Sequence, residues 1–340
     1  MRVLVTGGRG LLGSAAVREL VRRGHDVTCF QRSASGHDAP VREVLGDVTD
    51  AASVAGAASG ADAVVHLAAR VSMTGPWADF ERVNVEGTRI VLAAATKAGA
   101  RRFVHISSPS VAHAGEPLIG VGATPADAVH ARGNYARSKA MAEALALAAD
   151  GSALAVTVLR PHLVWGPGDT QLIGRIAERA RAGRLVLVDD GAALIDTTYV
   201  DNAAEAIAQA LEMCEHVDVR GRPFVVTNGE PRTVREILSR IAVAAGGARP
   251  PRRLPYPLAR GAGAVVERAW ARSGRPDEPP LTAFVAEQLA TAHWFDQRAT
   301  RQALRWTPRV SLDEGFACLA DWFDRDSRRG VAPDWPSGRV

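Results

Sequence analysis

Lysine and tyrosine are both rare in this chain of 340 residues. Of the 41 lysines and arginines only Lys97 and Lys139 are lysines, and the chain has three tyrosines. With so few of either, a tyrosine four positions before a lysine arises by chance in about 2% of such chains. The pair Tyr135 and Lys139 therefore indicates a chemical role.

Cysteine and long apolar runs are also scarce. Cys29, Cys214 and Cys318 lie far apart without Cys-x-x-Cys spacing, which predicts reduced thiols instead of disulfides or a metal site. No apolar run approaches transmembrane length, and residues 1–7 read as a strand and turn rather than a signal peptide. These features predict a cytoplasmic protein.

Charge of one sign does not dominate either. The net charge is +4 with an isoelectric point near 9.3, and the basic residues are scattered along the chain. A nucleic-acid surface needs basic residues gathered on one face, so no nucleic-acid partner is expected. With 47% hydrophobic and 23% charged residues, the composition is that of an ordinary soluble globular protein.

Short β-branched runs alternate with helical patterns in the first half of the chain. Strands are predicted over residues 3–6, 26–30, 41–45, 63–67, 103–107, 156–159 and 224–227, with helices over 11–23, 77–98, 135–149 and 200–213. This alternation predicts an α/β fold with a doubly wound parallel (Rossmann) sheet.

The pattern loosens after residue 165, which suggests a second unit. The dinucleotide-binding domain is predicted over 1–165, rejoined by 191–229, and a smaller substrate-binding cap over 166–190 and 230–330, with a tail over 331–340. The cap is expected to contain helices over 172–182 and 258–270 and a short strand over 185–188.

A glycine-rich turn joins the first predicted strand to the first helix. It reads Thr6-Gly7-Gly8-Arg9-Gly10-Leu11-Leu12-Gly13, with glycines at positions 7, 10 and 13. Glycines allow the tight turn and let backbone N–H groups approach a pyrophosphate, which the partial positive charge of the helix N-terminus attracts. This turn predicts dinucleotide binding.

The end of the second strand predicts which dinucleotide. A carboxylate there binds the ribose 2′-hydroxyl of NAD, whereas a basic residue accommodates the 2′-phosphate of NADP. Gln31 and Arg32 occupy this position without a carboxylate, and Arg9 lies in the glycine-rich turn. Because the arginine guanidinium can form two parallel hydrogen bonds with a phosphate, NADP(H) is favoured over NAD(H). The alternative is that either arginine is simply a solvated surface residue.

Tyr135 and Lys139 are four positions apart in a predicted helix, so their side chains share one face. A neighbouring ammonium is expected to lower the pKa of the phenol from about 10 toward neutrality. Tyr135 would then act as the general acid or base on a carbonyl or alcohol oxygen. A hydroxyl donor from Ser107, Ser108 or Ser110, at the end of the fifth strand, is expected to orient that oxygen.

These elements together resemble the extended short-chain dehydrogenase/reductase family. The resemblance covers most of the chain and includes the glycine turn, Gly46-Asp47-Val48, His66-Leu67-Ala68-Ala69, Asn84-Val85-x-Gly87-Thr88, Tyr135-x-x-x-Lys139 and Arg160-Pro161. Ser107-Ser108-Pro109-Ser110-Val111 and the segment from Leu159 to Asp169 resemble the 3β-hydroxysteroid dehydrogenase branch, which includes sterol 4-carboxylate 3-dehydrogenases and 2-alkyl-3-oxoalkanoate reductases.

The resemblance implies roles for individual residues. Ser108, Tyr135 and Lys139 would be catalytic, and Lys139 would also hold the nicotinamide ribose. Asp47 would contact the adenine. Asn84 would support a buried hydrogen-bonded network. The other residues expected at the cofactor are Gly7, Arg9, Gly10, Leu11, Leu12, Gly13, Gln31, Arg32, Val48, Leu67, Ala68, Ala69, Pro161 and Leu163. Those expected at the substrate are Ser110, Val111, His162 and Trp165. For His113 and His162 a packing or hydrogen-bonding role is favoured over a catalytic one. No metal is expected. Members of the branch often carry aspartate where Gln31 stands, which adds to the case for NADP.

The expected function is interconversion of a 3-oxo and a 3-hydroxy group on a hydrophobic substrate, either steroid-like or a long-chain β-keto acid. A nucleotide-sugar epimerase or dehydratase uses the same core and stays an alternative, as does a redox sensor that binds the cofactor without turnover. The resemblance also implies a homodimer, because paired helices often make dimers in this family. Arg252, Arg253 and Arg260 allow at most peripheral membrane contact.

Overall fold

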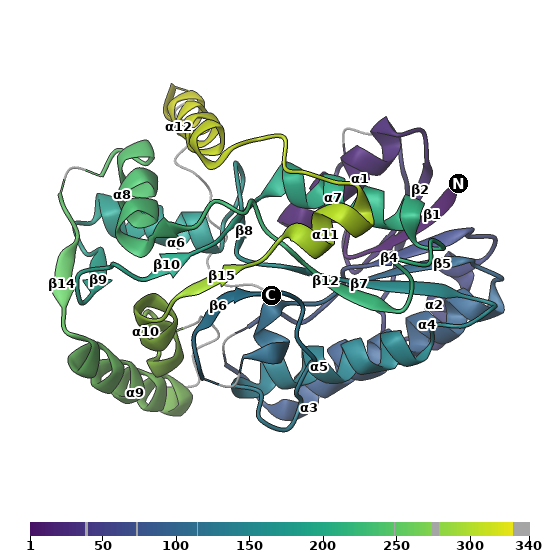
Figure 1. Ribbon diagram of the computed structural model, residues 1–340, viewed down its shortest axis with the longest axis horizontal. Helices are drawn as coiled ribbons and strands as arrows, with labels where there is room; N and C mark the ends of the chain where they lie inside the picture. Colours follow the sequence, from purple (N-terminus) through teal and green to yellow (C-terminus); the bar gives the residue numbers. More distant parts are fainter. Residues whose placement is uncertain (38–39, 73, 114, 248, 274–278, 329–340) are drawn as a thin grey trace.

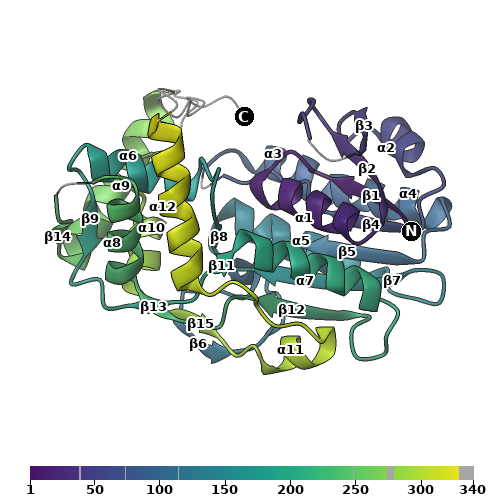
Figure 2. The ribbon, with the colours of Figure 1, turned by 90° about the horizontal axis from the view of Figure 1, so that it is seen from above.

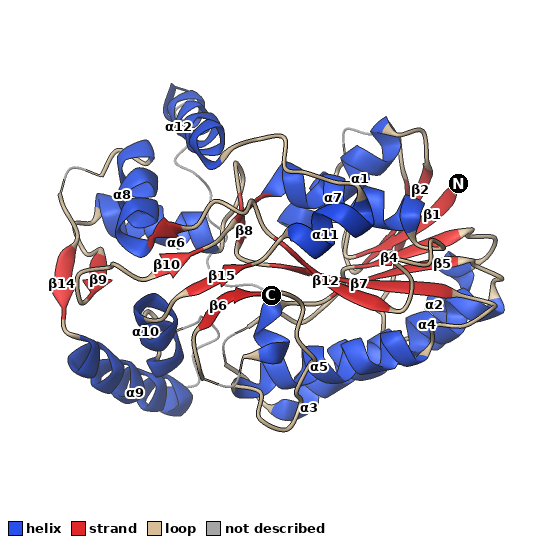
Figure 3. Ribbon diagram, viewed as in Figure 1, coloured by secondary structure: helices blue, strands red, loops and turns tan. Residues whose placement is uncertain are grey.

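A seven-stranded parallel sheet forms the larger part of the computed structural model, which describes residues 1–37, 40–72, 74–113, 115–247, 249–273 and 279–328. The strand order is β12-β7-β5-β4-β1-β2-β3 (Figure 3). The strands are β1 (Arg2–Thr6), β2 (Asp26–Gln31), β3 (Arg42–Leu45), β4 (Ala63–His66), β5 (Arg102–Ile106), β7 (Ala155–Pro161) and β12 (Arg222–Val226). The prediction of a doubly wound parallel sheet is confirmed.

Alternating side chains of the strands build a core on each face of the sheet. In β1, Val3 and Val5 enter one core and Leu4 enters the other, as the two-residue period of a strand requires. One face is covered by α1 (Leu11–Arg22), α7 (Val200–Met213) and α11 (Arg298–Leu304), and the other by α2 (Ala51–Ala58), α4 (Gly87–Lys97) and α5 (Gly133–Ala148) (Figure 1).

The helix predicted over 77–98 is present without a break from Trp77 to Lys97, but it is not α-helical throughout. It consists of α3 (Trp77–Phe80), a π-helical turn (Glu81–Glu86) and α4. Such turns insert an extra residue and re-aim the side chains within them, and they are frequent at functional sites. The π-helical turn here carries Asn84, which is buried.

The cap lies beyond the carboxyl ends of the parallel strands (Figure 2). Its four-stranded sheet has the order β13-β10-β15-β6, and two further strand pairs accompany it. The sheet strands are β6 (Leu118–Val121), β10 (Leu194–Ile195), β13 (Arg232–Thr233) and β15 (His293–Phe295), and the pairs are β8 (Val164–Trp165) with β11 (Thr198–Tyr199) and β9 (Val186–Val188) with β14 (Arg252–Leu254).

Five helices complete the cap: α6 (Leu172–Arg181), α8 (Val234–Ala244), α9 (Tyr256–Ser273), α10 (Ala283–Ala290) and α12 (Leu312–Arg328). A separate apolar core joins α6, α8 and α12 around Trp165 and Phe316. Among the described helices none is both long and apolar enough to cross a bilayer.

The predicted division into domain and cap stays a prediction, but two observations bear on its boundaries. Helix α11 falls within the range predicted for the cap, yet its Ala303 and Leu304 pack into the core of the large sheet. Strand β6, within the range predicted for the dinucleotide-binding domain, joins the sheet of the cap. The predicted tail lies outside the described residues.

Candidate active site

Helix α5 carries Tyr135 and Lys139 on one face at the carboxyl edge of the large sheet. The Tyr135 hydroxyl hydrogen-bonds Ser108, which follows β5. The Lys139 ammonium is buried and donates to the carbonyl oxygen of Ile106, the last residue of β5. The three predicted catalytic residues are thus gathered around one strand end.

The pKa of Tyr135 departs from expectation. The sequence predicted that Lys139 lowers it, whereas burial raises the pKa of Tyr135 to about 12 and only the Ser108 hydrogen bond opposes this. Lys139 directs its ammonium to a backbone carbonyl instead of the phenol, so the predicted lowering is corrected. In this state the phenol stays protonated and is equipped to donate a proton.

Lys139 itself is a buried cation. Removing it from water favours its neutral form and lowers its pKa to about 8, with Glu143 one turn further along α5 acting in the opposite direction. Lys139 therefore changes protonation near neutral pH, unlike an ordinary exposed lysine.

A short 3₁₀ turn (Pro109–Ala112) follows Ser108 and orients it. The Ser108 hydroxyl accepts from the Ser110 backbone N–H at 3.3 Å and lies 3.0 Å from the Ser110 hydroxyl. Ser108 is thereby the N-cap of this turn, and its hydroxyl hydrogen is left for Tyr135 or a substrate oxygen. Ser110, predicted at the substrate, lies beside it.

A buried ion pair that the sequence reasoning did not identify supports this arrangement. Glu143 and Arg160 are each 1% exposed and meet with Arg160 Nε 3.0 Å from Glu143 Oε2. The Ser107 hydroxyl also donates to Glu143 at 2.6 Å. The pair fixes α5 against the ends of β5 and β7, and its only sequence signal is the repeat of the four-residue spacing from Tyr135 to Lys139 to Glu143.

Asn84 connects the π-helical turn to the loop after β4. Its amide accepts from Arg70 N at 2.7 Å and donates to Arg70 O at 3.1 Å and to the Ser138 hydroxyl at 2.9 Å. All three contacts are within the protein, so the structure gives Asn84 a supporting position, beside the loop that contains Leu67, Ala68 and Ala69.

The glycine-rich turn fits a dinucleotide pyrophosphate. Gly7 has a φ of +77°, and a Cβ there would lie 2.8 Å from Ala68 N. A Cβ on Gly13 would lie 2.2 Å from Gly7 O. No side chain caps α1, whose N-cap is Gly10 and whose first residues are Leu11 and Leu12, so its first backbone N–H groups are open to an anion.

The residues predicted at the adenosine end differ in their partners. Arg9 donates to the Ser33 hydroxyl at 2.6 Å, and Arg32 is exposed. Gln31 is buried and donates to Glu43 at 3.2 Å, a carboxylate that the sequence reasoning did not consider. Asp47 accepts from Thr49 N at 2.9 Å, which lowers the pKa of its carboxyl, and Val48 beside it is buried.

The residues predicted at the substrate separate into two groups. His162 follows Pro161 at the end of β7, and its ring lies near those of Phe295 and His293 in β15, a strand that the prediction did not include. Leu163 beside it, which was predicted at the cofactor, is 40% exposed with a φ of +42°. In contrast, Val111 is fully buried, and Trp165 is 1% exposed and stacks on Phe316 in the cap core.

The sequence of this chain is similar to those of known enzymes. The model of the NAD dependent epimerase/dehydratase family matches residues 3–226. This chain belongs to that family. It is 42% identical over 324 residues to the 2-alkyl-3-oxoalkanoate reductase of Stenotrophomonas maltophilia, covering 94% of this chain and 98% of the relative.

Two further proteins show the range within the epimerase/dehydratase family. The 3-beta-hydroxysteroid dehydrogenase of Mycolicibacterium neoaurum is 30% identical over 354 residues, covering 98% of this chain and 95% of the relative. MoeE5, solved with UDP-glucuronic acid and NAD, has a TM-score of 0.72 and 26% identity, covering 97% of this chain and 100% of MoeE5. The predicted family is confirmed, and the chain is an enzyme of it that binds a nicotinamide cofactor.

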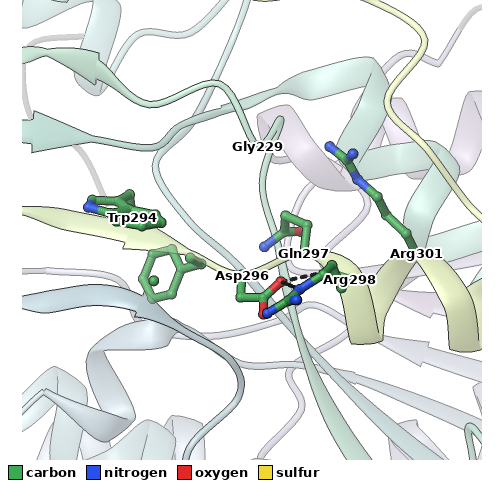
Figure 4. A pocket seen from close by; sticks show the side chains of 8 residues that line it. Gly229, Trp294, Asp296, Gln297, Arg298 and Arg301 are labelled. Carbon is green, nitrogen blue, oxygen red and sulfur yellow. Dashed lines mark hydrogen bonds and ion pairs between the residues drawn. The ribbon is translucent and has the colours of Figure 1, made fainter.

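A cavity of about 380 Å³ lies apart from the residues that the epimerase/dehydratase family uses. Its walls include Trp294, Gln297, Arg301 and the ion pair of Asp296 with Arg298 at 2.6 Å (Figure 4). None of the predicted site residues lines it. Across the described part of the chain, no group of three or more His, Cys, Asp or Glu residues is arranged to hold a metal ion.

Proposed function

We propose that this enzyme interconverts the 3-oxo and 3-hydroxy groups of a long-chain alkyl-substituted β-keto acid. The observation that carries the proposal is the Tyr135 hydroxyl bonded to Ser108 beside a dinucleotide cradle. The 42% identity to a 2-alkyl-3-oxoalkanoate reductase over nearly the whole of both chains supports this substrate class over steroids.

The proposed mechanism follows from the positions of the hydroxyl groups. In reduction, the substrate carbonyl oxygen accepts hydrogen bonds from Ser108 and Tyr135. A reduced nicotinamide cofactor, with its pyrophosphate held at the turn from Gly7 to Gly13, would supply the hydride to the carbonyl carbon. Tyr135 then gives its proton to the oxygen, for which its protonated state is suited. Lys139, held by Ile106, keeps a positive charge close to the phenolate that forms.

A substrate panel tests the function. The purified enzyme is given a 2-alkyl-3-hydroxyalkanoic acid, a 3β-hydroxysteroid and a UDP-sugar, each with NADP⁺, while absorbance of the reduced cofactor is followed. We expect the hydroxy acid to be oxidised with the highest kcat/KM. Epimerisation of the UDP-sugar without net cofactor reduction, and no oxidation of the acid, would instead identify an epimerase.

We also propose that NADP(H) is preferred over NAD(H). Arg9 and exposed Arg32 flank the end of β2 and suit a 2′-phosphate, although Glu43 close to Gln31 is a carboxylate in the same region. Arg32→Ala is expected to raise the KM for NADPH by about tenfold or more and to leave that for NADH nearly unchanged. Arg42→Ala is the matched control, because Arg42 lies at the start of β3, away from the end of β2. Equal effects of Arg32→Ala on both cofactors would contradict the preference.

Location and assembly complete the proposal. Cys29 and Cys214 are free and buried and Cys318 is free and exposed, which suits a reducing cytoplasm. Helices α4 and α5 pack side by side and are proposed to pair with their copies in a homodimer. Light scattering should then give twice the chain mass of 35.9 kDa. Contact with membranes is proposed to be at most peripheral.

A further inference from the structure

Three imidazole rings lie together beyond the active-site serines. His113 ends the 3₁₀ turn, His162 follows β7, and His293 begins β15. The His293 ring centroid is 5.5 Å from that of His113 and 6.1 Å from that of His162. His113 and His293 are 3% and 2% exposed, so these two rings of the histidine cluster are buried, whereas His162 is half-buried.

The cluster is close to the reacting groups. Ser108 and His113 flank the same 3₁₀ turn, five residues apart, which corresponds to about 10 Å between their Cα atoms. His162 follows the strand that runs beside β5, where Ser107 N donates to Leu159 O at 2.7 Å. This separation leaves room for a short polar group, attached to the reacting carbon, to lie between Ser108 and His113.

The cluster has hydrogen-bonding capacity that the protein does not use. His162 Nδ1 donates to the Asp196 carbonyl oxygen at 2.6 Å, which leaves its Nε2 as the site for a proton. The Gln288 amide lies 3.1 Å from His113 Nε2. His293 Nε2 is buried and has no hydrogen-bond partner among the described residues. A buried nitrogen without a partner costs free energy unless a ligand supplies one.

The cluster is uncharged before a ligand enters. Burial and the neighbouring rings lower the pKa of His162 to about 4 and that of His293 to about 3, and burial also lowers the pKa of His113. Other charged groups act on the cluster at His113, where Glu287 and Glu116 favour protonation and Arg132 opposes it. The Asp196 carboxylate is occupied by Thr227 and Gly229 N. An entering anion would make protonation of one ring favourable.

We infer that His113, His162 and His293 form the subsite for the carboxylate of the 3-oxo acid, and that one proton is taken up together with that carboxylate. The inference rests on the proposed function for its substrate class. A steroid, which has no acid group, would leave His293 Nε2 unpaired. A metal is not the ligand either, since no described cluster is arranged for one.

Proton uptake is a direct test. A 2-alkyl-3-hydroxyalkanoic acid, which is stable whereas β-keto acids lose CO₂, is titrated calorimetrically into the enzyme–NADPH complex, in which the alcohol cannot be oxidised, and its methyl ester is titrated in parallel. Repeating the titration in two buffers of different ionisation enthalpy gives the number of protons bound. We expect about one proton for the acid, none for the ester, and weaker binding of the acid alone as the pH rises.

Variants of His293 locate the subsite. His293→Phe keeps an aromatic ring without a donor and should lower the ratio of kcat/KM for the acid to that for the ester by about tenfold or more. His293→Gln keeps a donor that cannot titrate, so it should retain part of the ratio and lose the proton uptake. Trp294→Phe, which changes the neighbouring residue in the wall of the separate cavity, is the control and should retain both (Figure 4).

The possible outcomes separate this inference from the proposed function. Turnover of the acid without proton uptake, or equal losses for acid and ester in His293→Phe, overturns the inference and leaves the function intact. Failure of the acid to bind the complex overturns it as well. Proton-coupled binding of the acid without turnover supports the subsite and overturns the proposed reaction.

Discussion

At the scale of single residues, the site holds a half-buried tyrosine and a buried lysine whose pKa values move in opposite directions. Burial raises the pKa of Tyr135 to about 12 and lowers that of Lys139 to about 8. Both shifts favour the uncharged form, because a charge loses its hydration in the interior. The free enzyme is therefore set for proton donation by Tyr135, and the phenolate formed in reduction depends on Lys139 for its charge balance.

Removing the phenol hydroxyl tests its role. Tyr135→Phe is expected to lower kcat by about 10²- to 10⁴-fold, because no other proton donor replaces it, while NADPH binding, measured by fluorescence, is retained. Tyr256→Phe, on cap helix α9, is the matched control and should keep full activity. Undiminished turnover in Tyr135→Phe would exclude the proposed mechanism.

Lys139 gives a prediction about stability and pH. Its folded pKa lies below its unfolded value of 10.5, so the unfolded chain binds more protons between pH 8 and 10.5 and the native state gains stability as the pH rises through that range. Lys139→Met lacks this gain. The wild type should therefore become more stable relative to the variant by up to about 3 kcal/mol over this range.

Urea unfolding at several pH values, analysed as the difference between the two proteins, measures this effect. Lys97→Met, which removes the other lysine of the chain, is the control and should show no comparable gain. A constant difference between wild type and Lys139→Met from pH 8 to 10.5 would show that Lys139 is not the titrating group.

The functional residues were predictable from the sequence where the chemistry requires a particular pair of residue types. They were less predictable where their contacts are with residues distant in sequence. Rarity and spacing were enough to select Tyr135 and Lys139. The direction of the Tyr135 pKa shift was not predictable, because it depends on Lys139 bonding to Ile106. The contact of His293 with His113 was not predictable either, because it depends on the pairing of β15 with β6, two strands distant in sequence.

At the scale of elements, the first turn of α1 is the part that excludes side chains most strictly. A Cβ on Gly13 would lie 2.2 Å from Gly7 O, whereas one on Gly56 in α2 would meet nothing within 4 Å. Both glycines lie in helices, but only Gly13 is crowded. Replacing each of them by alanine should therefore have opposite effects on stability.

Gly13→Ala should displace the turn and lower the free energy of unfolding by about 1–3 kcal/mol, with a large loss of cofactor affinity. Gly56→Ala should instead raise it by about 0.5–1 kcal/mol, because alanine reduces the entropy of the unfolded chain without a clash. Chemical denaturation and cofactor titration of both variants check this. Normal cofactor affinity in Gly13→Ala would contradict the close approach on which the cradle depends.

The strands at the centre of the large sheet were predictable because they are buried runs rich in β-branched residues, whereas the edge strand β3 is exposed at both ends. The strands of the cap were mostly missed, because β10 and β13 have two residues each and show no alternation. The π-helical turn within residues 77–98 also lacks a local signal. It follows from Asn84 reaching Arg70 and Ser138, which are distant in sequence.

At the scale of the whole molecule, Asp196 joins the two sheets. It follows β10 of the cap and is fully buried, and its carboxylate accepts from the Thr227 hydroxyl at 2.6 Å, just after β12. It also accepts from Gly229 N at 3.2 Å and Glu230 N at 3.4 Å. Asp196 is therefore one of the residues that hold the cap in place over the active site.

That acid makes the stability of the molecule depend on pH. Burial raises the pKa of Asp196 to about 6, above its ordinary value of 3.8, so its contribution is fully present below pH 3.8 and is lost as the pH rises through 6. Asp196→Asn keeps an acceptor for the two N–H groups and has no charge to bury. The stability of this variant relative to the wild type should therefore rise by up to about 3 kcal/mol between pH 4 and 7.

Asp196→Ala removes the acceptor altogether and should lower stability by about 1–3 kcal/mol for each buried donor left unpaired. The free energy of unfolding in urea, measured for the three proteins at both pH values, separates the two effects. If Asp196→Asn and Asp196→Ala were equally destabilised at pH 7, the carboxylate charge itself, rather than the acceptor geometry, would hold the cap to the sheet.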